Sequence, residues 1–218
     1  MITFEQIKKN PAIKEYITRA GESMDAIGYT EHSHTHARRV SGTAAFILKE
    51  LGYSERECEL AQIAGYMHDI GNLVNRCDHA QSGAMMAFRI LDKMGMEPSE
   101  LATIVTAIGN HDEQTAVAVN PVAAALIIAD KTDVRRSRVR CQPVDFDIHD
   151  RVNYSVKKAE VVVDAENKRI ELMLTTDKKS FSALEYFEIF MERMLLCRRA
   201  AEKLGVQFFT YFDGQLLA

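Results

Sequence analysis

The apolar positions of the first 140 residues recur at steps of three and four, the period of an amphipathic helix. In "THARRVSGTAAFILKELG" they are Val40, Ala44, Ile47, Leu48 and Leu51, and Gly52 ends the segment. "PVAAALIIADKTDVRRSRV" begins at Pro121, is apolar on one side, and predicts a long helix running past Asp130. The pattern predicts a helical domain over residues 1–143.

Other segments carry helix start and stop signals. "SERE" at 54–57 has the form of a capping box and opens a helix that runs to Met67. "HAQSGAMMAFRILDKMG" is closed by Gly95, and "PSELATIVTAIGNH" begins at Pro98 and runs to about His111.

After Pro143 the pattern changes to period two, which indicates strands. "KAEVVVDAENKRIELMLTT" predicts a β-hairpin with its turn near Glu166–Asn167. "SALEYFEIFMERMLLCRRAAEKLG" predicts an amphipathic helix, and "VQFFTYFDGQLLA" a terminal strand with a turn at Asp213–Gly214. The predicted fold is therefore mainly α: a helical bundle with a small C-terminal α+β element at 144–218.

Two roles are open for the C-terminal element. Its Phe- and Met-rich helix is typical of a packing module that covers the helical body or forms a homodimer. The alternative is a lid over a substrate, with His149, Asp150 and Arg151 near the pocket.

Composition narrows the class of protein. The chain has 218 residues, 47% of them hydrophobic and 27% charged, as expected for a globular protein. Its formal net charge of −4 gives no global attraction to a nucleic-acid polymer, and no apolar run is long enough to cross a membrane. The start lacks an apolar signal core, so we expect a cytoplasmic protein whose four scattered cysteines stay reduced.

Histidines and aspartates stand at the predicted helix ends. His36 starts a helix, His68–Asp69 ends one, His79 starts the next and His111 ends another, whereas Asp130 lies inside an apolar helix. Each alone suits an ordinary polar helix end. A carboxylate among apolar residues needs a cation or several donors, and imidazole with carboxylate is a ligand set for iron, manganese, nickel or zinc.

The order of these residues resembles the HD superfamily of metal-dependent phosphohydrolases. "HARRV" at 36–40, "HDIGN" at 68–72 and "ADKTD" at 129–133 resemble its defining segments, although many members have Lys where Asn72 stands. "HAQSGA" at 79–84 and "AIGNH" at 107–111 resemble the additional ligands of its two-metal subset, which includes bacterial diadenosine tetraphosphate hydrolases and HD-GYP phosphodiesterases. The GYP segment is absent, which argues against cleavage of cyclic dinucleotides.

The resemblance implies a role for each matching residue. His36, His68, Asp69 and Asp130 would hold a first divalent transition-metal ion, and His79 and His111 would complete a second site. Asp69 would bridge the two ions, and the role of Asp112 is open. His68, Asp69 and Asp130 would then be the catalytic residues.

The implied activity is cleavage of a phosphoester or phosphoanhydride in a nucleotide or other small phosphorylated metabolite, with a bridging water activated as hydroxide by the metals. One alternative is a mixed-valent di-iron oxygenase with a nearly identical ligand set. Another is a nucleotide-binding sensor whose C-terminal element reports the bound state.

Several basic residues are candidates for binding the substrate. Lys131, Arg135 and Arg138 follow Asp130, and a continuous helix would bring Arg138 back toward the metal side about two turns on. An arginine fork matches two phosphoryl oxygens, but a solvated basic face is the ordinary alternative. Arg76 is a further candidate, and His32 is predicted at the rim of the site.

Overall fold

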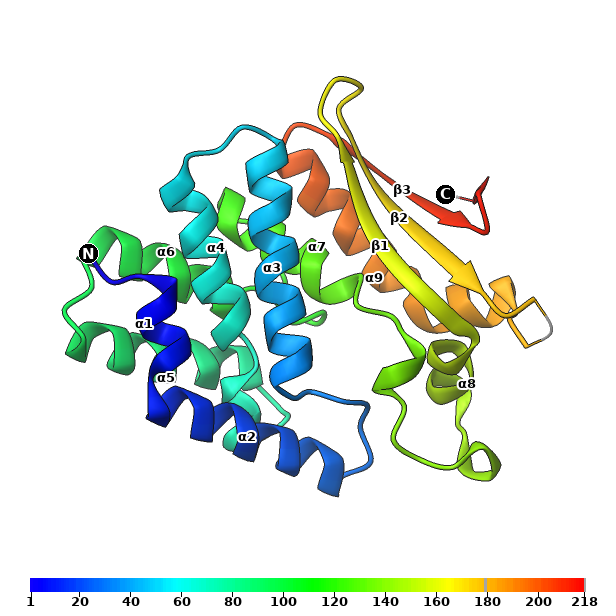
Figure 1. Cartoon of the computed structure of the whole chain (residues 1–218), viewed down its shortest axis with the longest axis horizontal. Coiled ribbons are helices and arrows are strands. Elements are labelled where there is room, and N and C mark those ends of the chain that lie inside the picture. Colours follow the sequence, from blue (N-terminus) through cyan, green and yellow to red (C-terminus); the bar gives the residue numbers. More distant parts are fainter. Residues whose placement is uncertain (179, 218) are drawn as a thin grey trace.

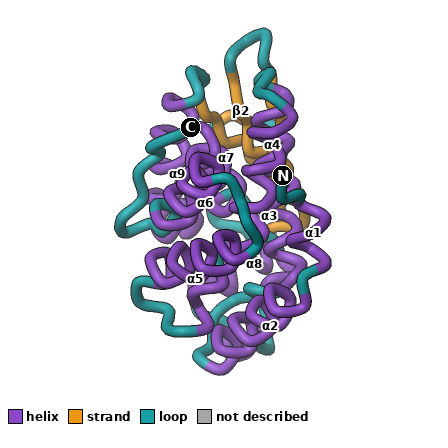
Figure 2. Tube along the Cα trace, turned by 90° about the vertical axis from the view of Figure 1, so that its left-hand side faces the viewer, coloured by secondary structure: helices purple, strands orange, loops and turns teal. Residues whose placement is uncertain are grey.

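The computed structural model describes residues 1–178 and 180–217. Figure 1 shows a body of helices with a small sheet on one side, and Figure 2 shows the strands gathered at one end of the molecule. The mainly α fold with a C-terminal α+β element is confirmed. The helices are α1 (Phe4–Lys9), α2 (Pro11–Ala26), α3 (His34–Glu50), α4 (Glu55–Met67), α5 (His79–Lys93), α6 (Pro98–Gly109), α7 (Pro121–Lys131), α8 (Ile148–Ser155) and α9 (Ala183–Lys203).

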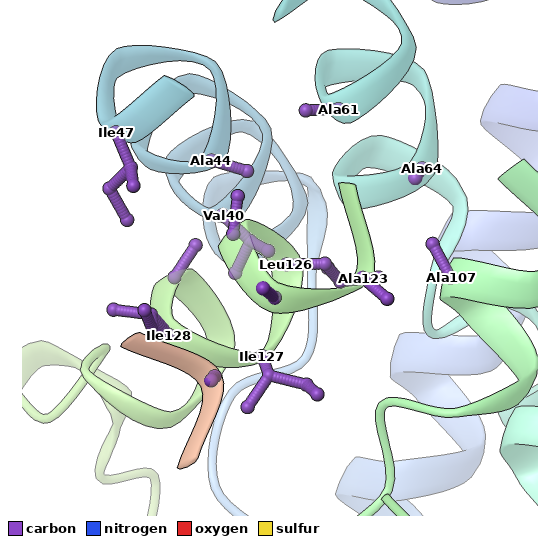
Figure 3. Packing of buried hydrophobic residues seen from close by; sticks show 14 of the residues in the cluster. Val40, Ala44, Ile47, Ala61, Ala64, Ala107, Ala123, Leu126, Ile127 and Ile128 are labelled. Atoms are coloured by element: carbon purple, nitrogen blue, oxygen red, sulfur yellow. The ribbon is translucent and has the colours of Figure 1, made fainter. Parts of the chain in front are cut away.

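The centre of the helical body is α7. All of its residues from Val122 to Ala129 are buried, so this helix is apolar all round and not, as the sequence pattern predicted, on one side only. It packs against α3, α4, α6 and α9. Figure 3 shows these contacts at close range, with side chains from α3, α4, α6 and α7: Val40, Ala44, Ile47, Ala61, Ala64, Ala107, Ala123, Leu126, Ile127 and Ile128.

The prediction that the helix containing Asp130 continues well beyond this residue is wrong. Helix α7 ends at Lys131, where the Thr132 hydroxyl donates a hydrogen bond of 2.6 Å to the Ile128 carbonyl. Asp133 and Val134 then turn inward and are buried, and a short 3-10 turn follows at Arg136–Arg138. Arg138 is therefore not on the helical face of Asp130, and the predicted two-turn spacing does not apply.

The C-terminal element has the predicted hairpin, helix and terminal strand. The strands are β1 (Val156–Asp164), β2 (Arg169–Thr176), β3 (Gln207–Phe212) and β4 (Gln215–Leu216), in the order β1-β2-β3-β4. Strands β2 and β3 are parallel because α9 lies between them in the chain, whereas the other pairs are antiparallel. The short helix α8 was not predicted.

One hydrophobic cluster runs through both parts of the chain. It contains Ile127 and Ile128 of α7 together with Cys197 and Ala200 of α9 and Leu172 of β2. The proposed domain boundary at 143/144 remains a prediction. No helix in the described ranges is both long enough and apolar enough to span a bilayer.

Candidate metal centre

Five helix ends bring six side chains together. Ser33 caps α3, which places His36 in its first turn, while His68 caps the C-terminal end of α4 and Asp69 follows it. His79 opens α5, His111 lies two residues beyond α6, and Asp130 lies near the end of α7. The four imidazoles are at most 2% exposed. The sequence placed five of these residues at helix ends, whereas Asp130 was expected inside a helix and lies near the end of α7 because that helix is shorter than predicted.

One half of the cluster contains His36, His68 and Asp130. The Nε2 atoms of the two histidines are 3.3 Å apart. Asp130 Oδ1 lies 3.3 Å from His36 Nε2 and 3.6 Å from His68 Nε2. Asp69 Oδ2 also faces this half, at 3.2 Å from His68 Nε2 and 3.6 Å from His36 Nε2.

The other half contains His79 and His111, whose Nε2 atoms are 3.2 Å apart. The second oxygen of Asp69, Oδ1, lies 3.5 Å from His79 Nε2 and 3.9 Å from His111 Nε2. Asp69 thus faces one histidine pair with each carboxylate oxygen, which is the geometry of a bridging ligand. Asp112 Oδ1 is 3.9 Å from His79 Nε2, at the edge of this half.

Each imidazole is held by a hydrogen bond at its Nδ1 atom. The acceptors are Asp133 Oδ2 for His36 (2.7 Å) and the carbonyls of Gly65 for His68 (2.9 Å), Arg76 for His79 (3.1 Å) and Ile108 for His111 (2.6 Å). Because an acceptor fixes the proton on Nδ1, the Nε2 lone pair of each neutral ring points into the cluster.

This donor set fits metal ions. Two acceptor nitrogens that face one another cannot hydrogen-bond to each other, whereas a cation between them would be bound by both. Two nitrogens bound at about 2.1 Å to one ion, at an angle near 100°, are about 3.2 Å apart. The measured separations of 3.3 and 3.2 Å match that spacing in both halves.

The electrostatics of the cluster also favour a cation. Burial alone would lower the pKa of His68, but the carboxylates of Asp69 and Asp130 outweigh it and raise the pKa to about 10. A metal ion at His68 Nε2 would replace that proton and would be attracted by the same two carboxylates. Burial lowers the pKa of His111 well below its usual range, so that ring stays neutral as a ligand must.

The segment after Asp69 is shaped by close packing. The Asn72 amide donates a 2.9 Å hydrogen bond to Asp69 Oδ1 and so fixes the orientation of the carboxylate. A side chain at Gly71 would collide with the backbone of His79 and Gly83. Glycine at this position therefore lets the end of α4 approach α5 closely enough for Asp69 and His79 to meet.

Residues 34–135 match the family model of the HD domain. This part of the chain is an HD domain. Among known proteins, the chain is 26% identical to the uncharacterized protein MJ1020 of Methanocaldococcus jannaschii, with 84% of this chain and 80% of that protein covered. It is also 26% identical to a predicted HD superfamily hydrolase from an uncultured Thermotogales bacterium. The match to the crystal structure of that protein covers 62% of this chain and 75% of that chain, with a TM-score of 0.43.

A pocket of about 380 Å³ opens onto the histidine and aspartate cluster of the HD domain. Asp69, His79 and Asp130 lie in its wall. The rest of the wall comes from the loops before α3 and α5, from α7 and the segments on either side of it, and from α8 and α9: Ile27, Gly28, Tyr29, Thr30, His32, Arg76, Glu113, Lys131, Arg138, Asp147, His149, Asp150, Asn153, Phe190 and Arg193. The C-terminal element thus forms one side of the pocket, although Arg151 pairs with Glu185 instead of lining it.

Four of the five candidate substrate-binding residues line the pocket. Lys131, Arg76, Arg138 and His32 line the pocket, whereas Arg135 does not and pairs with Glu31 and Asp133. Burial and the nearby Arg138 lower the pKa of His32 to about 3, so His32 is neutral at pH 7.

Sequence reasoning missed two kinds of residue. It gave no role to Asp133, which is 4% exposed, or to the α9 residues Phe190 and Arg193. Asp133 carried a signal, because it is an acid three residues after Asp130 and is followed by three arginines. Arg193 carried none, since its position depends on how α9 packs on the HD domain.

Proposed function

We propose that the protein is a metal-dependent phosphohydrolase that cleaves a phosphoester or phosphoanhydride of a nucleotide or other small phosphorylated metabolite. The observation that supports this most is Asp69, whose two oxygens face two separate histidine pairs at the base of a pocket lined by cations. An HD domain with this donor set is suited to a divalent-metal hydrolase.

The residues divide into two sites that share Asp69. His36, His68 and Asp130 would hold one divalent ion, and His79 and His111 the other, with iron, manganese, nickel and zinc all compatible with imidazole and carboxylate. When bound, the two ions would lower the pKa of a water molecule to near neutrality and offset negative charge on the phosphoryl oxygens.

The protein's own groups prepare the site for this chemistry. The hydrogen bonds at each Nδ1 hold the rings in place before a ligand arrives. Lys131 Nζ lies 2.6 Å from Asp130 Oδ2 and offsets the charge on that oxygen, while Oδ1 faces the histidines. Pre-set groups of this kind need no rearrangement during a reaction, which favours a charged transition state.

The test is a screen of manganese-loaded protein against nucleotides and phosphoesters, with released phosphate as the readout. We expect phosphate release by the natural sequence and none above background by Asp69→Ala. Asp92→Ala, which removes an exposed carboxylate from α5, is the matched control and should be fully active.

Metal analysis of the same samples checks the number of ions. We expect about two per chain in the natural sequence. Equal phosphate release by the natural sequence and Asp69→Ala would refute the assigned centre, and oxygen uptake with iron in the absence of any phosphate release would favour the oxygenase. One ion per chain would remove the role given to His79 and His111.

A further inference from the structure

The cations in the pocket wall differ in how many of their donors the protein already uses. Lys131, Arg138, Arg76 and Arg193 all line the pocket. A cation whose donors are already paired inside the protein gains little from a ligand, whereas one with unpaired donors has bonds to offer. The hydrogen-bond partners of each therefore indicate which of them can bind an anion.

Arg138 and Lys131 are already paired. Arg138 Nε donates to the Glu31 carbonyl at 3.0 Å and its Nη1 to the Asp133 carbonyl at 2.9 Å, so it ties the loop before α3 to the segment after α7. Lys131 is 5% exposed and is paired with Asp130. Both side chains therefore mainly stabilise the protein's own structure and have few donors left for an anion.

Arg193 on α9 is the contrasting case. Its Nε atom is buried and has no hydrogen-bond partner among the described residues. Glu113 Oε1 lies 2.5 Å from this atom, which makes an ionic contact that lacks the alignment of a hydrogen bond. The guanidinium lies over the Phe190 ring, 4.6 Å from its centroid, and this contact fixes its plane.

The Nη groups of Arg193 have no hydrogen bond or ion pair within residues 1–178 and 180–217. A planar fork whose position is fixed and whose outer donors are unpaired, in the wall of a pocket, is the arrangement that binds the oxygens of a phosphate or carboxylate. Arg76 is partly free in the same way. Its Nη1 lies beside His79 Nε2, at 3.3 Å, and 3.4 Å from Asn72 Oδ1.

The two arginines lie at different depths from the metal ligands. Arg76 is next to His79, whereas Arg193 is separated from Asp130 by two side chains. Lys131 Nζ is 2.6 Å from Asp130 and 3.8 Å from Glu113, which in turn contacts Arg193. An anion on Arg193 therefore lies outside the position of a phosphoryl group at the centre.

We propose that Arg193 binds a second anionic group of the substrate, which lies farther out in the pocket than the phosphoryl group at the metal centre. The C-terminal element would thereby select substrates with a diphosphate or an equivalent pair of anions. This inference rests on the proposed phosphohydrolase function and adds the substrate class to it. It also assigns a substrate-binding role to an element outside the HD domain.

The test compares two ligands that the protein cannot hydrolyse. Methylenediphosphonate carries two linked anionic groups, and methylphosphonate carries one. Binding of each to manganese-loaded, dialysed protein is measured by isothermal titration calorimetry. We expect Arg193→Met to weaken the binding of methylenediphosphonate about tenfold and to leave methylphosphonate unchanged, since one charge-assisted contact is lost. Arg193→Lys should retain part of the affinity, because it keeps the charge but not the fork.

Arg198→Met is the matched control. It removes an exposed arginine from the same helix and should bind both ligands as the natural sequence does. Equal affinity of the natural sequence and Arg193→Met for methylenediphosphonate would overturn the proposal, as would a natural sequence that binds the two ligands equally well. Should Arg193→Met fail to fold, the same comparison is made with Arg193→Lys, and an unchanged affinity there overturns the proposal as well.

The two proposals fail in distinguishable ways. Loss of diphosphonate binding in Arg193→Met, together with no phosphate release from any ester by the natural sequence, supports the anion site and refutes the hydrolase. Phosphate release with an unchanged KM for diphosphate esters in Arg193→Met supports the hydrolase and refutes the role of Arg193.

Discussion

At the scale of single residues, the orientation of the imidazoles is set by groups outside the cluster. Asp133 shows this most clearly, because it is buried and its Oδ2 accepts the Nδ1 proton of His36 at 2.7 Å. Its other oxygen, Oδ1, lies 2.9 Å from Arg135 Nε and 3.0 Å from Arg39 Nε. Arg135 therefore supports His36, a proposed metal ligand, through Asp133.

We expect Asp133→Asn to weaken metal binding at the His36 half by about 10- to 100-fold. The two arginines would attract the amide oxygen, so the amide nitrogen would face His36 and favour the proton on Nε2. Manganese titration by calorimetry measures the change. Asp164→Asn, at the end of β1 before the hairpin turn, is the control. Equal affinities in the two variants would contradict the role given to Asp133.

The sequence was informative at this scale wherever a residue stands at the end of an element. His36, His68, Asp69, His79 and His111 could be placed because capping residues and apolar period fix where helices start and stop. Asp133 and Arg193 could not be assigned, since their roles come from contacts between segments that are far apart in the chain.

At the scale of elements, close approach of the backbones determines whether the two halves of the cluster meet. The segment Ile70–Leu73 packs against α5, and Gly71 is the point of contact. Secondary structure was predicted well here, but the distance between two helices depends on side-chain volume, which the hydrophobic pattern does not encode.

We expect Gly71→Ala to lower the free energy of unfolding by about 2 kcal/mol or more, because the added methyl collides with backbone atoms that cannot rotate away. Urea unfolding measures the loss. Gly42→Ala is the matched control, since a methyl there meets open space, and it should stabilise α3 by up to about 1 kcal/mol. A Gly71→Ala protein as stable as the natural sequence would show that the two backbones can separate freely.

Helices α4 and α6 are joined by a charged pair far from the cluster. Arg56 donates through Nε to Glu100 Oε1 at 2.7 Å and through Nη2 to the second oxygen. These hydrogen bonds lower the pKa of Glu100 below its usual range, against the effect of burial. The pair therefore stabilises the fold above the ordinary glutamate pKa, and this contribution is lost as the pH falls through the lowered value.

Glu100→Gln should cost about 1–2 kcal/mol of stability at pH 7, since the contact is no longer charge-assisted. The difference from the natural sequence should begin to shrink as the pH falls below the ordinary glutamate pKa of about 4.3, and it should vanish below the lowered pKa of Glu100. Urea unfolding at several pH values measures this. Glu202→Gln, on the exposed face of α9, should show no such pH dependence, and a constant difference for Glu100→Gln would argue against the pair.

At the scale of the whole molecule, the HD domain and the C-terminal element share one hydrophobic cluster. Helix α9 packs on the central helix α7, and the sheet covers α9 in turn through residues such as Phe212, whose ring contacts Tyr186 and Phe181. The sequence predicted both parts, but periodicity within each segment does not show which faces meet.

We expect residues 1–143 alone to be markedly less stable than the full chain, because removal of α9 exposes the apolar face of α7 to water. Thermal unfolding followed by circular dichroism should show one cooperative transition for the full chain and an earlier or broader one for the fragment. A fragment that melts at the same temperature as the full chain would indicate two independent domains.

The composite wall of the pocket has an evolutionary consequence. Mutations in α8 and α9 alter which compounds fit, while the histidines and aspartates on the HD side stay as they are. Selection could therefore change which compounds the pocket binds through substitutions in the C-terminal third alone. Proteins descended from one ancestor could then bind different compounds while they keep the same histidines and aspartates.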